Sequence, residues 1–131
     1  MAQELQIAAR LLIATVLGLA IGLERETARK PAGLRTIALV SLGAAAFTVA
    51  SVYGLEGLDP ARIAAGVVTG VGFLGAGAIW RSGDTVSGIT TATTIWAAAA
   101  IGLLAGMGML VSAVLTAAIV LVVLRLLPGK R

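Results

Sequence analysis

The sequence predicts an all-α integral membrane protein, a compact bundle of five transmembrane helices in a single transmembrane domain without a soluble domain. Of its 131 residues, 59% are hydrophobic and 12% are charged, whereas soluble domains are closer to half apolar and a quarter charged. Apolar runs of bilayer-spanning length alternate with short charged segments. The basic residues gather in those segments rather than along one amphipathic face, which is the pattern of a membrane topology signal.

The first span is expected at residues 5–23, about 28 Å of helix. Arg10 interrupts it near the outer end, where its long side chain is expected to reach the headgroups. A charged loop with two helix breakers follows. The second span is expected at residues 36–53, with Tyr53 as an interfacial anchor.

The third span is expected at residues 63–80, after a helix start at Asp59-Pro60, where aspartate caps and proline fits the first turn. Residues 89–127 are apolar enough to form one helix of about 58 Å, roughly twice the hydrocarbon thickness. That stretch should therefore break at its glycines. We expect a fourth span at residues 87–103 and a fifth at residues 107–127.

Charge asymmetry favours five spans with the N-terminus outside. Eight basic residues then lie on the inner side and two on the outer side. With four spans, five basic residues would lie on each side. The inner set is Arg25, Arg29, Lys30, Arg35, Arg81, Arg125, Lys130 and Arg131, and the outer set is Arg10 and Arg62. The positive-inside rule predicts a multi-pass protein with a cytoplasmic C-terminus.

The composition is poor in catalytic material. The chain has no Cys and no His, which removes thiolate nucleophiles, disulfides and the usual neutral-pH base. Its lysines, Lys30 and Lys130, fall in a loop and in the C-terminal tail, so no enzymatic function is expected. The net charge of +4 comes from basic residues placed between the spans, where they act as a topology signal. The expected partner is therefore the lipid bilayer and not nucleic acid.

Glycines spaced for close helix packing recur in the spans. The expected packing residues are Gly18, Gly22, Gly66, Gly70, Gly72, Gly75 and Gly77. The third span is thin on two faces and is expected in the centre of the bundle. Residues 72–77 either serve ordinary packing or bring bare backbone to a site.

Hydroxyl groups crowd the start of the fourth span, at Thr85, Ser87, Thr90, Thr91, Thr93 and Thr94. They either bond to the preceding turn and to neighbouring helices or line a hydrated vestibule.

A shift of 55 residues aligns Gly22 with Gly77, Gly33 with Gly88 and Thr36 with Thr91. This pattern favours two parallel helical-hairpin repeats followed by a fifth helix. The two inner loops would then meet and form a functional polar cluster. Its members are Glu24, Arg25, Glu26, Arg35, Thr36, Arg81, Asp84, Thr90, Thr91 and Thr94.

The acids of this cluster have two readings. Glu24, Glu26 and Asp84 are candidate ligands for Mg²⁺, which prefers oxygen donors. Alternatively, the arginines neutralise them in a structural salt-bridge network. The sequence predicts no particular cofactor, and Mg²⁺ is the one that the donor types allow.

Four motifs together resemble the MgtC/SapB family of bacterial inner-membrane proteins. They are Gly18-Leu-Ala-Ile-Gly22-Leu-Glu-Arg-Glu26, Pro31-Ala-Gly-Leu-Arg-Thr36, Gly70-Val-Gly-Phe-Leu-Gly-Ala-Gly77 and Gly88-Ile-Thr-Thr91. The resemblance covers about Leu11 to Leu124. The chain departs from it at Ile37, where some members have a polar residue, and by the absence of a soluble C-terminal domain that many members carry.

The resemblance implies a regulatory inner-membrane protein that supports adaptation to low magnesium and membrane-energy homeostasis. It also implies a link to virulence in some members and inhibition of a membrane partner such as the ATP synthase. A homo-oligomer, preferably a dimer, is expected. The alternative is a small oligomeric ion channel or transporter, with Mg²⁺ as its ion. The two departures weigh against the virulence and ATP-synthase roles for this member.

Overall fold

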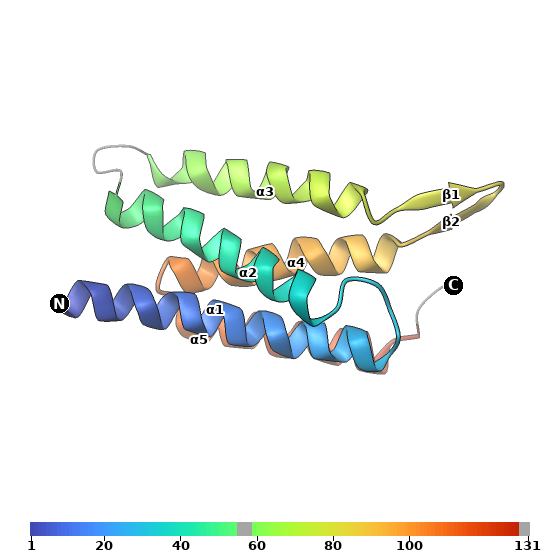
Figure 1. The fold of residues 1–131 in the computed structure, drawn as a ribbon, viewed down its shortest axis with the longest axis horizontal. Helices are drawn as coiled ribbons and strands as arrows, with labels where there is room; N and C mark the ends of the chain where they lie inside the picture. Colours follow the sequence, from blue (N-terminus) through green and yellow to red (C-terminus); the bar gives the residue numbers. More distant parts are fainter. Residues whose placement is uncertain (55–58, 129–131) are drawn as a thin grey trace.

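The computed structural model describes residues 1–54 and 59–128. Within these ranges the chain forms five α-helices, so the predicted all-α, five-helix architecture is confirmed (Figure 1). The helices are α1 (Ala2–Thr27), α2 (Leu34–Val49), α3 (Pro60–Ala76), α4 (Ile89–Gly106) and α5 (Leu110–Leu126). A π-helical turn, η1 (Ala50–Gly54), extends α2, and the strands β1 (Trp80–Ser82) and β2 (Thr85–Ser87) join α3 to α4.

Three segments have the length and apolar character of membrane spans: α1, α2 with its π-helical extension, and α4. Helices α3 and α5 are equally apolar in character but have 17 residues each, about 25 Å at 1.5 Å per residue. The long axes of all five helices run along one direction (Figure 1). The chain therefore has the architecture of a membrane-embedded bundle.

Helix α2 is held between α1 and α4 by glycines that leave no room for a side chain. A Cβ atom on Gly18 would lie 2.9 Å from Cα of Ala38, and one on Gly22 would lie 2.6 Å from Cα of Leu34. On the other side, a Cβ on Gly106 would meet the carbonyl oxygen of Ala45 at 2.7 Å. Such backbone contact is how helices associate in lipid, where no hydrophobic effect drives them together.

The third helix is not central, so that prediction was wrong. Along α3, only Val71 and Gly75 are buried. A Cβ atom on Gly66, Gly70 or Gly72 would have no atom of the described residues outside its own helix turn within 4 Å, whereas one on Gly75 would lie 3.2 Å from a carbonyl oxygen of α4. The spacing of the glycines identified the faces of this helix that carry small side chains. It could not predict whether another helix of the same chain packs against those faces.

The ends of the helices follow local signals in the sequence. Asp59 caps α3 by accepting a hydrogen bond from the backbone N–H of Ala61 at 3.0 Å, as predicted. The long apolar stretch breaks after Gly106, also as predicted, and Gly108 adopts φ +85° in the turn. Gly33 and Gly88, the pair aligned by the 55-residue shift, occupy the N-cap positions of α2 and α4.

The connection between α3 and α4 differs from the prediction. Residues 80–82 pair with residues 85–87 as an antiparallel β-hairpin, where a span end and a plain loop were expected. The third helix therefore ends at Ala76, and Thr85 and Ser87 lie in β2 rather than on the fourth helix. Gly83 and Asp84 form the two-residue turn of the hairpin, and Gly83 has φ +62°, a backbone conformation that such tight hairpin turns require.

Part of the predicted organisation lies outside the described residues. This holds for Lys130 and Arg131 of the charge tally and for residues 55–58 of the connection before α3.

Candidate functional site

One end of the bundle gathers most of the predicted polar cluster. The C-terminal ends of α1 and α5, the N-terminal ends of α2 and α4, and the β-hairpin all lie there, opposite the N-terminus (Figure 1). Alternation of antiparallel helices produces this arrangement. We call it the loop end.

Arg25 is the buried centre of the loop end. Its side chain is 4% exposed, and its Nη2 donates a hydrogen bond to Oγ1 of Thr91 at 2.6 Å. Thr91 is itself 3% exposed. This bond joins the end of α1 to the first turn of α4 and uses one of the five N–H donors of the guanidinium. The Nε atom of Arg25 has no partner among the described residues.

Glu24, the neighbour of Arg25, is also buried, with 7% of its surface exposed. Its Oε1 atom has no hydrogen-bond partner in the described part of the chain. A buried ion is costly unless an opposite charge and hydrogen bonds compensate it, so two adjacent buried charges of opposite sign offset part of each other's cost.

Glu24 also borders an open depression of about 460 Å³, shared with Thr27, Ala28 and Arg125. Arg125 was expected only as a topology signal. It lies in the last turn of α5, beside the end of α1. The sequence could not predict this position, because it depends on how α5 packs against α1.

Glu26 has a local structural role. Its Oε1 accepts a hydrogen bond from the backbone N–H of Leu34 at 3.2 Å, in the first turn of α2. A Cβ atom on Gly33 would collide with the Glu26 side chain. The carboxylate therefore satisfies an otherwise free helix N–H and complements the helix dipole. A glycine at position 33 leaves it the space.

The remaining members of the cluster outside α4 are on the surface. Arg35, Thr36, Arg81 and Asp84 are all exposed. Arg81 donates from Nε to the carbonyl oxygen of Gly83 at 3.0 Å, a contact inside the hairpin. These side chains are thus available to a partner at the loop end.

The described hydrogen bonds of the α4 threonines are of the first kind expected, to the preceding turn or to a neighbouring helix. Thr93 and Thr94 donate to the carbonyl oxygen of Thr90 at 2.9 and 2.7 Å, bonds back to the preceding turn. Thr91 instead accepts from Arg25. Thr90 is exposed.

The candidate Mg²⁺ ligands do not converge. Glu24 is buried, Glu26 is exposed and engaged with α2, and Asp84 lies exposed beyond β1. The described residues hold no group of three or more His, Cys, Asp or Glu side chains suited to a metal ion. Mg²⁺ prefers near-octahedral oxygen ligation, and the donors among residues 1–54 and 59–128 of one chain do not form a dedicated protein cage for this ion.

At the other end of the bundle, Arg10 plays a part that the sequence did not indicate. Its Nη1 donates to the carbonyl oxygen of Gly106 at 3.1 Å, and its Cζ lies 5.0 Å from the centre of the Tyr53 ring. The guanidinium therefore caps the C-terminal end of α4 and stacks on the π-helical turn. The prediction that it only extends to the headgroups missed these contacts.

A bundle of apolar helices, three of them long enough to cross a bilayer, defines a membrane protein. The sequence profile of the MgtC family matches residues 11–130, and the chain belongs to this family. A protein named MgtC from Salmonella typhimurium LT2 is 48% identical over 111 residues, covering 85% of this chain and 48% of that protein.

Two further relatives extend the comparison. YhiD of Escherichia coli K12, whose name proposes it as a magnesium transporter, is 49% identical over 108 residues, 76% of this chain and 50% of YhiD. An uncharacterized protein of Haemophilus influenzae is 43% identical over 95% of this chain and 57% of its own length. The chain thus spans about half the length of these relatives. Their names state no enzymatic activity. No solved structure matches the chain.

Proposed function

We propose that this chain is a regulatory membrane protein that supports adaptation to low magnesium and membrane-energy homeostasis through protein contacts in the membrane. One observation carries the proposal. The loop end combines a buried, fixed centre, Arg25 on Thr91, with an exposed charged rim that contains Arg35, Arg81 and Asp84. Such an arrangement suits a surface that docks a partner protein. The exposed charges would set the orientation of the partner and select it by charge complementarity.

The proposed setting is the inner membrane of a bacterium. All five helices cross it in one transmembrane domain, with the N-terminus outside and the loop end and C-terminus in the cytoplasm, as the charge asymmetry favours. We further propose self-association, preferably as a dimer, and a membrane partner of which the ATP synthase is one candidate. The shared glycine N-caps of α2 and α4 support the parallel hairpin repeat.

The alternative is a small oligomeric channel or transporter for Mg²⁺. Two observations favour keeping it: the name of the YhiD relative, and the buried Glu24 oxygen, which has no partner in the part of the chain that the structure describes. A second copy would have to supply the missing oxygen ligands, since the described residues of one chain hold no group of three or more suitable side chains.

Growth of a bacterium that lacks its own family member tests the proposal. The wild-type chain should restore growth at limiting Mg²⁺. Arg35→Glu reverses an exposed rim charge without touching the Arg25–Thr91 bond, so it should abolish the restoration while the protein accumulates normally in the membrane. Glu4→Gln, an exposed change at the opposite end of α1, is the matched control and should restore growth fully. Wild-type growth with Arg35→Glu would refute a docking role for the rim.

A further inference from the structure

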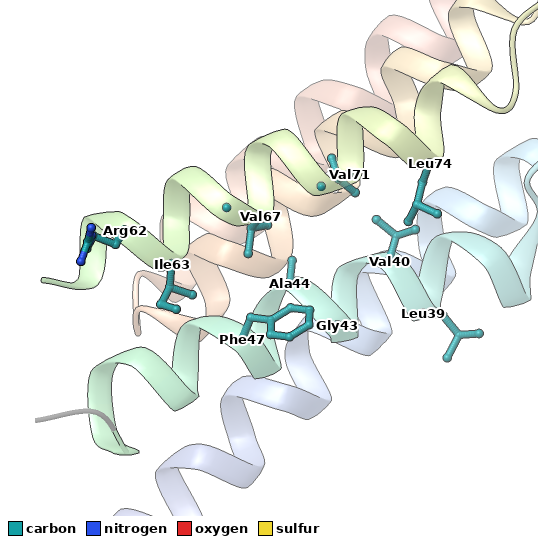
Figure 2. A pocket seen from close by; sticks show the side chains of 12 residues that line it. Leu39, Val40, Gly43, Ala44, Phe47, Arg62, Ile63, Val67, Val71 and Leu74 are labelled. Carbon is teal, nitrogen blue, oxygen red and sulfur yellow. The ribbon is translucent and has the colours of Figure 1, made fainter. Parts of the chain in front are cut away.

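An apolar groove runs between α2 and α3, with a volume of about 510 Å³ (Figure 2). Residues four apart on each helix form its walls, for example Gly43 and Phe47 on α2 and Gly66 and Gly70 on α3. The two glycines of α3 have open space where a Cβ would be, so the missing side chains give the groove its depth. Its volume falls within the range of small-molecule sites.

The groove has a charged end and an apolar length. Arg62 is the one charged residue among the described residues that line it. It lies in the first turn of α3, at the end of the bundle that holds the N-terminus (Figures 1 and 2). From there the groove extends along α3 to Leu74, about 18 Å at 1.5 Å per residue. One leaflet of a bilayer has roughly 15 Å of hydrocarbon, half of the core thickness. The groove therefore matches one leaflet in length, with its cation at headgroup depth.

We propose that this groove binds an anionic phospholipid, with its phosphate on Arg62 and one acyl chain between α2 and α3. Arginine recognises phosphate through charge-assisted hydrogen bonds. An acyl chain fills a channel lined by Phe47, Leu74 and bare glycine backbone without leaving a polar group unpaired.

A second copy of the chain suits this face less well. Two copies in one membrane have the same orientation, so a symmetric contact through α3 would place both Arg62 side chains at the same depth. Like charges near a low-dielectric medium repel strongly. A phosphate group brings the opposite sign to the same place.

The packing of the other glycine pairs supports this assignment. Gly18 with Gly22 and Gly102 with Gly106 already contact α2 inside the chain. The Gly66–Gly70 pair alone among these three remains open, and it opens into the groove that ends at Arg62.

Native mass spectrometry of the purified chain with added phosphatidylglycerol, or with phosphatidylcholine as the zwitterionic comparison, tests the proposal. We expect one phosphatidylglycerol per chain, bound more tightly than phosphatidylcholine. Arg62→Gln should weaken phosphatidylglycerol binding about tenfold, the effect of a lost charged hydrogen bond, and should remove the preference between the two lipids. Gly70→Leu should prevent binding of both by filling the groove.

Gly72→Leu is the matched control, because Gly72 lies on the same helix with equally open space but does not line the groove. It should bind lipid like the wild type. Circular dichroism and gel filtration check that each variant is folded, and Arg62→Gln, an exposed substitution, tests the site even if Gly70→Leu misfolds. Unchanged phosphatidylglycerol binding in Arg62→Gln would overturn the proposal. So would a dimer that Gly70→Leu dissociates without any lipid dependence, since a second copy would then occupy the groove.

Discussion

The Nη2 atom of Arg25 donates a 2.6 Å hydrogen bond to Oγ1 of Thr91, across 66 positions of the sequence. Both side chains are buried, so this bond joins the end of α1 to the start of α4 where water is largely excluded. It is the long-range side-chain contact around which the loop end is built.

Removing the acceptor should destabilise the bundle. Thr91→Val keeps the side-chain shape but leaves Nη2 of Arg25 buried and unpaired, at a cost of about 1–3 kcal/mol. The thermal midpoint of the protein in detergent should fall measurably. Thr90→Val is the control, because Thr90 is exposed on the neighbouring position. Equal midpoints for the two variants would show that the Arg25–Thr91 bond contributes nothing.

We expect the substitution of glycine by alanine to change the stability differently at Gly102 and at Gly72. Gly102→Ala would drive a Cβ into the backbone of Ser41, whose carbonyl carbon lies 2.8 Å from the ideal Cβ position, and overpacking of this kind costs roughly 1–3 kcal/mol. Gly72→Ala meets no atom within 4 Å, so it should be neutral or stabilising by up to about 1 kcal/mol from helix propensity. Thermal midpoints of the two variants measure the contrast. A lowered midpoint for Gly72→Ala alone would contradict the arrangement of α2 and α4.

Arg10 should contribute to stability through two contacts. Arg10→Gln removes the cation that caps α4 and stacks on Tyr53, and the loss of a charged hydrogen bond costs about 1.5–3 kcal/mol. Tyr53→Leu removes only the cation–π contact, worth about 0.5–2 kcal/mol. In a double-mutant cycle the two losses should be less than additive, because both remove the same stacking contact. Strict additivity would mean that Arg10 does not stack on Tyr53 in the membrane.

Topology can be read directly, because the sequence has no cysteine. Single variants Asp84→Cys in the hairpin and Ala2→Cys at the start of α1 place one thiol at each end. A maleimide that does not cross membranes should label Ala2→Cys in intact cells, and Asp84→Cys only after lysis. The reverse pattern would place the loop end outside and would contradict the charge-based orientation.

The sequence predicts well what depends on local chemistry. The cap at Asp59 follows from a short-range rule, the break near Gly108 follows from hydrocarbon thickness, and charge asymmetry favours five helices over four. The position of α3 at the edge could not be predicted, since glycine spacing is the same for an internal and an external face. The β-hairpin could not be predicted either, because strands of three residues are too short to show the alternating pattern of a β-strand.

For the loop end, the positions of the charged residues in the sequence identified the polar cluster but not which of its side chains are buried. Glu24, Arg25 and Glu26 are consecutive, yet the first two are buried and the third is exposed. That division depends on how α1 meets α4 and α2. Ile37, where some family members have a polar residue, is fully buried at 0% exposure. It therefore serves the core in this chain.

Magnesium flux into liposomes is the most direct measurement of the central claim, that the chain regulates through protein contacts rather than carrying an ion. Purified protein is reconstituted into vesicles that contain a Mg²⁺-sensitive dye, with Glu24→Gln and Glu26→Gln as variants. The regulatory role predicts that Mg²⁺ entry stays at the level of protein-free vesicles for the wild type and both variants. Protein-dependent entry that either substitution abolishes would contradict it and establish the transporter instead.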